Sequence, residues 1–443
     1  MTNPLLRAYY ISKNEGLRSL FRKSVDFLLT PVPSIDNLKF AVKDRTGDYP
    51  CDRTIMVTLR QSMFDSDTLS VVVQSVKRSD IDTVFLLVSS ESKFISSNKY
   101  ALESITGSDT EVKIIEEGSS HLPSAVAQSQ FIFIRNGPEL AGYRFVNTNS
   151  ERKFVRIFHG FAKASGGFRE RNAESGAVST VRLPRRFRPI DIYPVASDVE
   201  LFYRSAAEGI HPAQVKKCSY PKYTRLKRLR TGKDSPILPE KTKESLGNDG
   251  CKSRILYAPT HKGTYEPTEL FPFSDFDLQV LREQLESLDV VLYIRMHIHE
   301  EQAGIYDEYI DGDIIKYAGH GFSPSAAEIL PEFDVLITDY SSIYTEYLAL
   351  DRPILFIIDD TNPYWTNKGL AFDDEKYTPG PKISDFEDFL LELENHITDQ
   401  SRYCREREFA INSLVPDRDI DFLDCILDNC IEGKPNRSRD IVQ

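Results

Sequence analysis

Short apolar runs that end in polar residues predict buried strands along this chain. The clearest is Val335–Thr338, which is followed directly by the sequence Asp-Tyr-Ser-Ser. Apolar and β-branched residues in a run of this length suit a strand that is covered on both faces. Residues 343–350 then show a helical pattern. The segment therefore predicts a strand, a polar turn and a helix in succession.

Three other runs have the same form, at residues 255–260, 291–297 and 154–160. Each is apolar along its length and carries hydroxyl, Arg or His side chains at its end. Because the carboxyl ends of parallel strands lie at one edge of a sheet, and because that edge lines the ligand site in doubly wound sheets, we expect these groups to serve a common site.

The alternation of strands and helices predicts two α/β units, at residues 36–235 and 254–400. A stretch rich in Gly, Pro and charged residues at 231–253 fits a linker between them. Residues 401–443 are expected to form C-terminal helices and a tail. In the first unit, strands are expected at 54–59, 83–88, 112–115 and 131–134, with helices at 66–78 and 98–106.

Residues 1–35 form an amphipathic helical segment in this interpretation. Leu17, Leu20, Phe21 and Val25 recur at helical spacing, with basic residues mostly opposite. The helix either packs on the protein itself or lies on a lipid surface.

Composition limits the classes of function. The chain of 443 residues has 40% hydrophobic and 28% charged residues, which is ordinary for a globular protein. A net charge of −12 argues against general binding of nucleic acid. The six cysteines are widely spaced without a C-x-x-C pair, so we expect reduced thiols in a cytoplasmic protein. We expect no membrane span and no signal peptide.

One segment reverses the overall charge. Residues 182–233 contain thirteen Lys and Arg against four Asp and Glu, a balance of +9. Such a run favours an anionic partner, either the inner face of the cell membrane or a polyanionic acceptor chain. The alternative is that these charges pair with acidic groups elsewhere in the fold.

Residues 155–385 contain a set of ordered motifs: Phe158-His159-Gly160 with Lys163 and Gly166, Tyr220-Pro221-Lys222-Tyr223, Leu256-Tyr257-Ala258-Pro259-Thr260, Arg295-Met296-His297, Leu336 to Ser342, Arg352-Pro353-Ile354 and Pro379-Gly380-Pro381. In order and spacing, this set resembles the CDP-glycerol glycerophosphotransferase family, which includes the polymerases and primases of teichoic acids and related capsules.

The resemblance implies a GT-B-like α/β fold, in which two Rossmann-like domains face each other across a cleft and the donor sits on the second. It also implies transfer of glycerol phosphate from CDP-glycerol to a hydroxyl of a teichoic-acid-like or capsular polymer, with release of CMP and without a further cofactor. CDP-ribitol or another nucleotide-sugar donor is an alternative. A binding or scaffold module without turnover is another.

His159 and His297 are the predicted catalytic residues. A neutral imidazole with a pKa near 6.5 suits proton abstraction, and we assign that role to His159. Arg295 and His297 are two residues apart on one strand, so both face one side and are predicted to hold a diphosphate. The alternatives are a structural histidine at 159 and a surface ion pair at 295.

The remaining predicted site residues bind substrate. Ser341 and Ser342 are expected to donate to the diphosphate at the start of a helix. Asp339 is expected to order the turn or to bind a sugar hydroxyl, and Glu346 to reach ribose or glycerol hydroxyls unless it is a solvated helix residue. The predicted set also contains Gly160, Lys163, Thr260 and Lys262.

Asp311-Gly312-Asp313 matches the D-x-D pattern of metal-dependent transferases. Asp-Gly is also a strong turn signal, and the surrounding residues are polar. We therefore expect a turn here and no metal ion at the site.

Overall fold

The computed structural model describes most of the chain between residues 39 and 431. The described residues are 39–42, 53–59, 63–135, 140, 143, 149, 151–157, 170–171, 178–179, 190–208, 210–250, 253–260, 268–297, 300, 304, 306–339, 341–358, 374–416 and 421–431. The predicted N-terminal helix at 1–35 and the chain end after 431 lie outside them.

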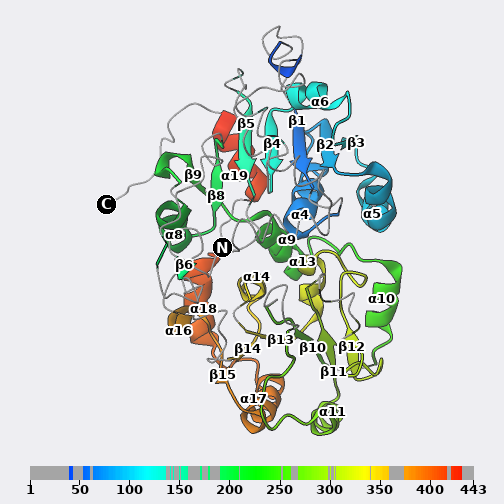
Figure 1. Cartoon of the computed structure of the whole chain (residues 1–443), viewed down its shortest axis with the longest axis vertical. Coiled ribbons are helices and arrows are strands. Elements are labelled where there is room, and N and C mark those ends of the chain that lie inside the picture. The colour runs from blue at the N-terminus through cyan, green and yellow to red at the C-terminus, as the bar shows by residue number, and fades with distance from the viewer. Residues whose placement is uncertain are drawn as a thin grey trace.

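A five-stranded parallel sheet forms the core of the N-terminal lobe (Figure 1). Its strand order is β3-β2-β1-β4-β5, and the expected strands of this unit are confirmed. All four residues of β4 are buried apolar side chains, as expected for a parallel strand that is covered on both faces. The strands are β1 (Thr54–Thr58), β2 (Thr83–Val88), β3 (Glu111–Glu116), β4 (Phe131–Ile134) and β5 (Lys153–Arg156).

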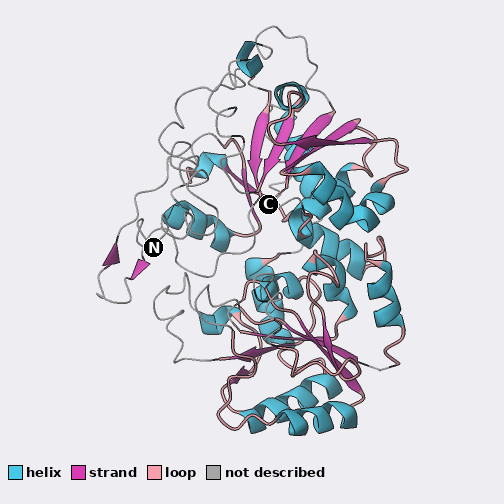
Figure 2. Cartoon of the chain, turned by 45° about the vertical axis from the view of Figure 1, so that its right-hand side comes forward, coloured by secondary structure: helices cyan, strands magenta, loops and turns pink. Residues whose placement is uncertain are grey.

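A six-stranded parallel sheet forms the core of the C-terminal lobe. Its order is β12-β11-β10-β13-β14-β15, so the strands that end in the predicted polar groups, β11, β10 and β13, are direct neighbours. The strands are β10 (Ser253–Tyr257), β11 (Val290–Ile294), β12 (Ile315–Tyr317), β13 (Val335–Thr338), β14 (Ile354–Ile357) and β15 (Lys382–Ile383). Figure 2 shows this sheet between helices on both sides.

Most of the helices in the two lobes connect successive strands, and the last two of them follow the final strand, β15. In the N-terminal lobe they are α4 (Ser66–Ser75), α5 (Glu91–Ile105) and α6 (Leu122–Gln128). In the C-terminal lobe they are α11 (Leu278–Ser287), α13 (Ala326–Ile329), the 3₁₀ turn η4 (Leu330–Glu332), α14 (Ile343–Leu348), α16 (Asp374–Tyr377), α17 (Phe386–Thr398) and α18 (Cys404–Leu414).

The remaining elements lie outside the two large sheets. They are β6 (Glu170–Arg171) paired with β7 (Val178–Ser179), β8 (Tyr193–Val195) paired with β9 (Val215–Lys217), α8 (Asp198–Glu208), the 3₁₀ turn η3 (Pro212–Gln214), α9 (Pro221–Arg230), α10 (Glu240–Gly247) and α19 (Phe422–Ile431). Two expectations need correction: α10 lies within the predicted linker, and α5 begins seven residues before the expected helix at 98.

Local sequence explains where the central helices begin. Asp65 caps α4 because its carboxylate accepts from the backbone N–H groups of Asp67 and Thr68, at 2.9 and 3.0 Å, while Thr68 Oγ1 accepts from Asp65 N. Pro221 occupies the first turn of α9, where its missing N–H costs nothing. The basic residues in the last turn of α9 match the helix dipole.

Helix α9 joins the two lobes, and Figure 1 shows it between the two sheets. A continuous set of buried apolar side chains runs from Met56 and Ile132 through Leu226 on α9 and its N-cap residue Tyr220 to Leu336 in the C-terminal sheet. The lobes therefore share one core along α9 rather than meeting only through solvated surfaces.

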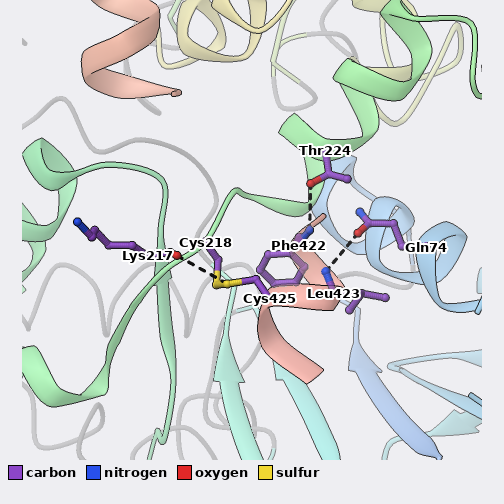
Figure 3. Close-up of a disulfide and its surroundings, with 7 residues drawn as sticks. All are labelled: Gln74, Lys217, Cys218, Thr224, Phe422, Leu423 and Cys425. Carbon is purple, nitrogen blue, oxygen red and sulfur yellow. Dashed lines mark hydrogen bonds between the residues drawn. A yellow bond between two sulfur atoms is a disulfide. The ribbon is translucent and has the colours of Figure 1, made fainter. Parts of the chain in front are cut away.

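The end of the described chain returns to the N-terminal lobe, where Cys218 and Cys425 form a disulfide (Figure 3). The expectation that all six cysteines are reduced thiols was wrong for this pair. The two cysteines are 207 residues apart, so their spacing gave no signal. They meet because α19 packs on α4 and α9, where Phe422 N donates to Thr224 Oγ1 at 3.2 Å.

Replacing Cys218 with Ser should lower the free energy of unfolding by roughly 2–5 kcal/mol, because the unfolded chain loses a cross-link. Urea unfolding with and without a reductant measures this. Reductant should shift the wild-type midpoint but not that of Cys218→Ser, and Cys404→Ser, at an exposed free thiol, is the matched control. A wild-type midpoint that ignores the reductant contradicts the pairing.

Candidate functional site

The carboxyl edge of the C-terminal sheet gathers several predicted site residues. Thr260 follows β10, Arg295 and His297 follow β11, and Asp339 follows β13. Because β11, β10 and β13 are adjacent and parallel, their ends lie side by side. His297 is exposed at this edge.

Asp339 connects two of these strand ends directly. Its Oδ1 accepts from Thr260 N at 2.9 Å, from Thr260 Oγ1 at 2.5 Å and from Ser341 N at 3.1 Å. One carboxylate oxygen thus fixes the turn after β10 relative to the turn after β13. The hydrogen bonds of Asp339 are those of a residue that orders a turn, and Thr260 donates two of them.

Ser341 and Ser342 lie between β13 and α14. Ser341 Oγ faces the N–H of Ile343 at 3.5 Å, and the backbone carbonyl of Ser342 accepts from Thr345 Oγ1 at 2.8 Å. Ser342 is the N-cap residue of α14, but its side chain makes no capping hydrogen bond. Both serines are partly exposed at the edge that His297 also occupies.

Arg295 is engaged with the protein itself. Its Nη1 donates to the carbonyl oxygens of Ala318 and Gly319 at 2.8 and 3.2 Å, and its Nη2 donates to Ser323 O at 2.9 Å. The side chain is buried. In this structure Arg295 therefore holds the segment after β12, and the surface ion pair considered as its alternative is wrong. Its contact with a diphosphate stays a prediction.

Glu346 lies in a buried ion cluster rather than on a solvated helix face. Its Oε1 accepts from Lys222 Nζ at 2.7 Å, and Lys222 also lies 3.5 Å from Asp67 Oδ2. Glu346 comes from α14, Lys222 from α9 and Asp67 from α4. We call these three residues the junction triad. It spans both lobes.

Burial controls the charges of the junction triad. Burial raises the pKa of the Asp67 carboxyl to about 6, and the nearby Glu346 acts in the same direction, although Lys222 opposes both. Burial lowers the pKa of the Lys222 ammonium, but Asp67 and Glu346 outweigh this effect and leave it above its usual value. Lys222 thus stays charged at neutral pH, whereas the Asp67 carboxyl titrates about one pH unit below neutrality.

Asp67 and the structural role of Lys222 were not found from the sequence. Asp67 sits two residues after the cap residue Asp65, where an acidic residue usually serves only the helix dipole. Its partner is 155 positions away in the chain. Only the packing of α4 on α9 brings the two together.

Other polar contacts join the lobes beside the triad. Arg225 on α9 donates to both carboxylate oxygens of Glu328 on α13, each at 2.7 Å. Tyr223 OH donates to Thr345 Oγ1 at 3.0 Å. Ala327 N donates to Ser66 Oγ at 3.2 Å. The triad is therefore held in a closely packed polar boundary.

Four predicted site residues lie outside the described residues: His159, Gly160, Lys163 and Lys262. Strand β5 ends at Arg156, beside β4 in the N-terminal sheet. The chain that leads to His159 therefore starts from the edge of that sheet. The roles of these four residues stay predictions.

The Asp311-Gly312-Asp313 segment forms the expected turn. Asp311 Oδ1 accepts from three successive N–H groups, of Asp313, Ile314 and Ile315, at 2.8–3.0 Å, and Asp311 Oδ2 pairs with Arg282. Gly312 has φ +85°, which favours glycine. No group of three or more possible metal ligands occurs within the described residues.

Several basic residues of the segment at 182–233 form ion pairs where the structure describes it. Arg225 is buried against Glu328 and Asp234, and Arg228 contacts Asp234 and Asp421. Lys222 is buried in the triad. The expectation that Arg225 belongs to a basic attachment surface was therefore wrong, because its charge is neutralised inside the fold.

Comparison with known proteins identifies the family. A family model for CDP-glycerol:poly(glycerophosphate) glycerophosphotransferases matches residues 72–419, well over half of the chain. This chain belongs to that family. The site residues after β10, β11 and β13 all lie within the matched region.

Individual relatives are more distant. The chain is 35% identical over 148 residues to the teichoic acid poly(glycerol phosphate) polymerase of Bacillus spizizenii, a match that covers 32% of this chain and 36% of that protein. It is 30% identical over 158 residues to the teichoic acid ribitol-phosphate primase of the same organism, covering 34% and 38%. The matched parts thus span little more than a third of these relatives.

The solved structure of the wall teichoic acid polymerase TagF superposes with a TM-score of 0.62 at 17% identity, over 89% of this chain and 93% of that one. At that identity the likeness concerns the fold alone. It confirms the GT-B-like α/β architecture with two parallel sheets that the sequence predicted. Among the described helices, none has the length and apolar character that crossing a membrane requires.

The pH dependence of the free energy of unfolding should reveal the raised pKa of Asp67. A carboxyl whose pKa rises from 3.8 unfolded to about 6 folded favours the folded state at low pH, and this contribution is lost as pH rises through about 6. The stability of wild type relative to Asp67→Asn should therefore fall by up to about 3 kcal/mol between pH 4 and pH 7. Urea unfolding across that range measures it. A difference that does not vary with pH contradicts the buried, protonated carboxyl.

Proposed function

We propose that this chain transfers glycerol phosphate from CDP-glycerol to a hydroxyl of a polyol-phosphate or capsular polymer. The observation that carries the proposal is the joined edge of the C-terminal sheet, where Asp339 fixes the turns after β10 and β13 beside the exposed His297. Membership of the glycerophosphotransferase family supports the reaction class.

In the proposed reaction an acceptor oxygen attacks the β-phosphorus of the donor. The new P–O bond forms to the acceptor, the P–O bond to CMP breaks, and CMP leaves with the bonding electrons. The acceptor hydroxyl gives its proton to a base, the role we assign to His159. His297 and the two serines 341 and 342 bind the phosphate oxygens, where donated hydrogen bonds stabilise the charge that moves onto CMP.

CDP-ribitol is the second candidate donor. The similarity to a ribitol-phosphate primase favours it, and that match is of the same order as the match to the glycerol-phosphate polymerase. The proposed phosphate contacts serve both donors equally. The acceptor is expected to be polyanionic. Peripheral attachment to the inner face of an anionic membrane remains part of the proposal through residues 1–35 and the basic residues at 182–188, all outside the described residues.

Incubation of the purified chain with CDP-glycerol or CDP-ribitol and a polyol-phosphate acceptor tests the function. The expected result is acceptor-dependent release of CMP. His297→Ala should lower the rate about 10²- to 10⁴-fold, because the transition state loses a phosphate contact.

His121→Ala provides the matched control, because that histidine is exposed at the start of α6 and makes no side-chain capping bond. It should retain the wild-type rate. A folded His297→Ala enzyme with wild-type turnover removes this residue from the mechanism, and no CMP release from either donor overturns the function.

Replacing Ser341 and Ser342 together with Ala should weaken donor binding and leave the acceptor KM unchanged, because the proposed contacts are to the donor diphosphate. Calorimetry with CDP-glycerol alone gives the affinity, and we expect a loss of about tenfold or more. Unchanged affinity places the diphosphate elsewhere.

A further inference from the structure

The junction triad contains one cation and two carboxylates. Lys222 Nζ lies 2.7 Å from Glu346 Oε1 and 3.5 Å from Asp67 Oδ2. The exposed fraction is 1% for both Asp67 and Lys222 and 8% for Glu346. At this depth no solvent screens the charges, so the charge state of each member acts strongly on the others.

Each carboxylate of the triad keeps one oxygen outside the ion pairs. Asp67 Oδ1 and Glu346 Oε2 are both buried and have no hydrogen-bond partner among the described residues. A buried carboxylate oxygen without a donor is costly unless a proton or a ligand hydroxyl satisfies it. Burial raises the pKa of the Asp67 carboxyl to about 6.

We propose that Asp67 is a positioning residue: it shares the Lys222 ammonium with Glu346 and thereby keeps Glu346 Oε2 able to accept a hydrogen bond from a hydroxyl of the donor. This inference rests on the proposed function, in which Glu346 serves the donor. It adds a residue from the N-terminal lobe to a site built on the C-terminal sheet.

The physical reason is the division of one positive charge. When Asp67 is ionised, Lys222 is attracted to both carboxylates and neutralises neither completely, so Glu346 remains a strong acceptor. When Asp67 carries a proton, the Lys222 ammonium pairs with Glu346 alone. It then neutralises Glu346 more completely, and the acceptor strength of Glu346 falls. Hydrogen bonds to ionised acceptors are about twice as strong as hydrogen bonds to neutral ones. The change in acceptor strength of Glu346 therefore changes the affinity for the donor.

The other charged groups around Asp67 are paired elsewhere, so the protonation of Asp67 acts mainly on Lys222 and Glu346. Arg135, the residue after β4, pairs with Asp65 and lowers the pKa of Lys222. From α13, Glu328 is bound by Arg225, and from α19, Asp424 pairs with Arg78 beyond the far end of α4. Tyr223 of α9 donates to Thr345. Strand β1 contributes no titratable side chain.

Asp67→Asn tests the proposal, because the amide matches the shape of the protonated acid. At pH 8 the variant should raise the donor KM about 5- to 20-fold and change kcat less than threefold, since Glu346 binds the donor hydroxyl in the ground state as well. Wild-type donor affinity should fall as the pH drops from 8 to 5 and converge on the affinity of the variant, whose own affinity should not follow this curve.

Glu328→Gln is the matched control. It weakens another buried ion pair between the same helix and the C-terminal lobe, three residues further along α9. It should lower stability without changing the donor KM or its pH dependence. If Glu328→Gln reproduces the KM and pH effects of Asp67→Asn, the triad acts only through general stability and the proposal is wrong.

Calorimetry with CDP-glycerol from pH 5 to pH 8 measures the donor affinity of the wild-type protein, so this test does not depend on a variant that folds. An affinity that is constant over this range overturns the positioning role, even when CMP release proceeds normally. Absence of both donor binding and CMP release with either CDP-alditol instead overturns the proposed function, and the inference falls with it.

Discussion

Two buried cations on helix α9 hold the two lobes together, and one of them, Lys222, also connects the N-terminal lobe to the helix that follows the serine turn. Lys222 reaches Asp67 in the N-terminal lobe and Glu346 in the C-terminal lobe, while Arg225 reaches Glu328. Removing one partner of such a pair leaves an unpaired buried charge, which costs about 3–5 kcal/mol. The orientation of α14, which carries Glu346 and starts at the serine turn, is therefore coupled to the N-terminal sheet.

The elements that the sequence predicted best are those with strong local signals. Strand β4 is apolar throughout, and β13 is followed directly by Asp-Tyr-Ser-Ser, so both strands were placed within a residue of their observed ends. The sequence predicted that the polar ends of several strands serve a common site, and the ends of β11, β10 and β13 do lie side by side. The turn at Asp311 was likewise recognised, because an Asx turn and a glycine at positive φ are local features.

What the sequence missed is long-range pairing between charged or sulfur-bearing side chains. Asp67 meets Lys222, and Cys218 meets Cys425, only after helices have packed. Arg225 looked like one charge among many in a basic run, yet it is buried against Glu328. Arg295 faces the backbone carbonyls after β12 rather than solvent. Charge and spacing along the chain carry no information on these partners until the tertiary contacts are known.

A crystal structure of the chain with CDP-glycerol would locate the donor. We expect the diphosphate at the carboxyl edge of the C-terminal sheet, within hydrogen-bond distance of the turn at Ser341 and Ser342 and beside His297. We also expect a donor hydroxyl on Glu346 Oε2. A diphosphate bound against the N-terminal sheet, or at the amino edge of the C-terminal sheet, would contradict the proposed donor site.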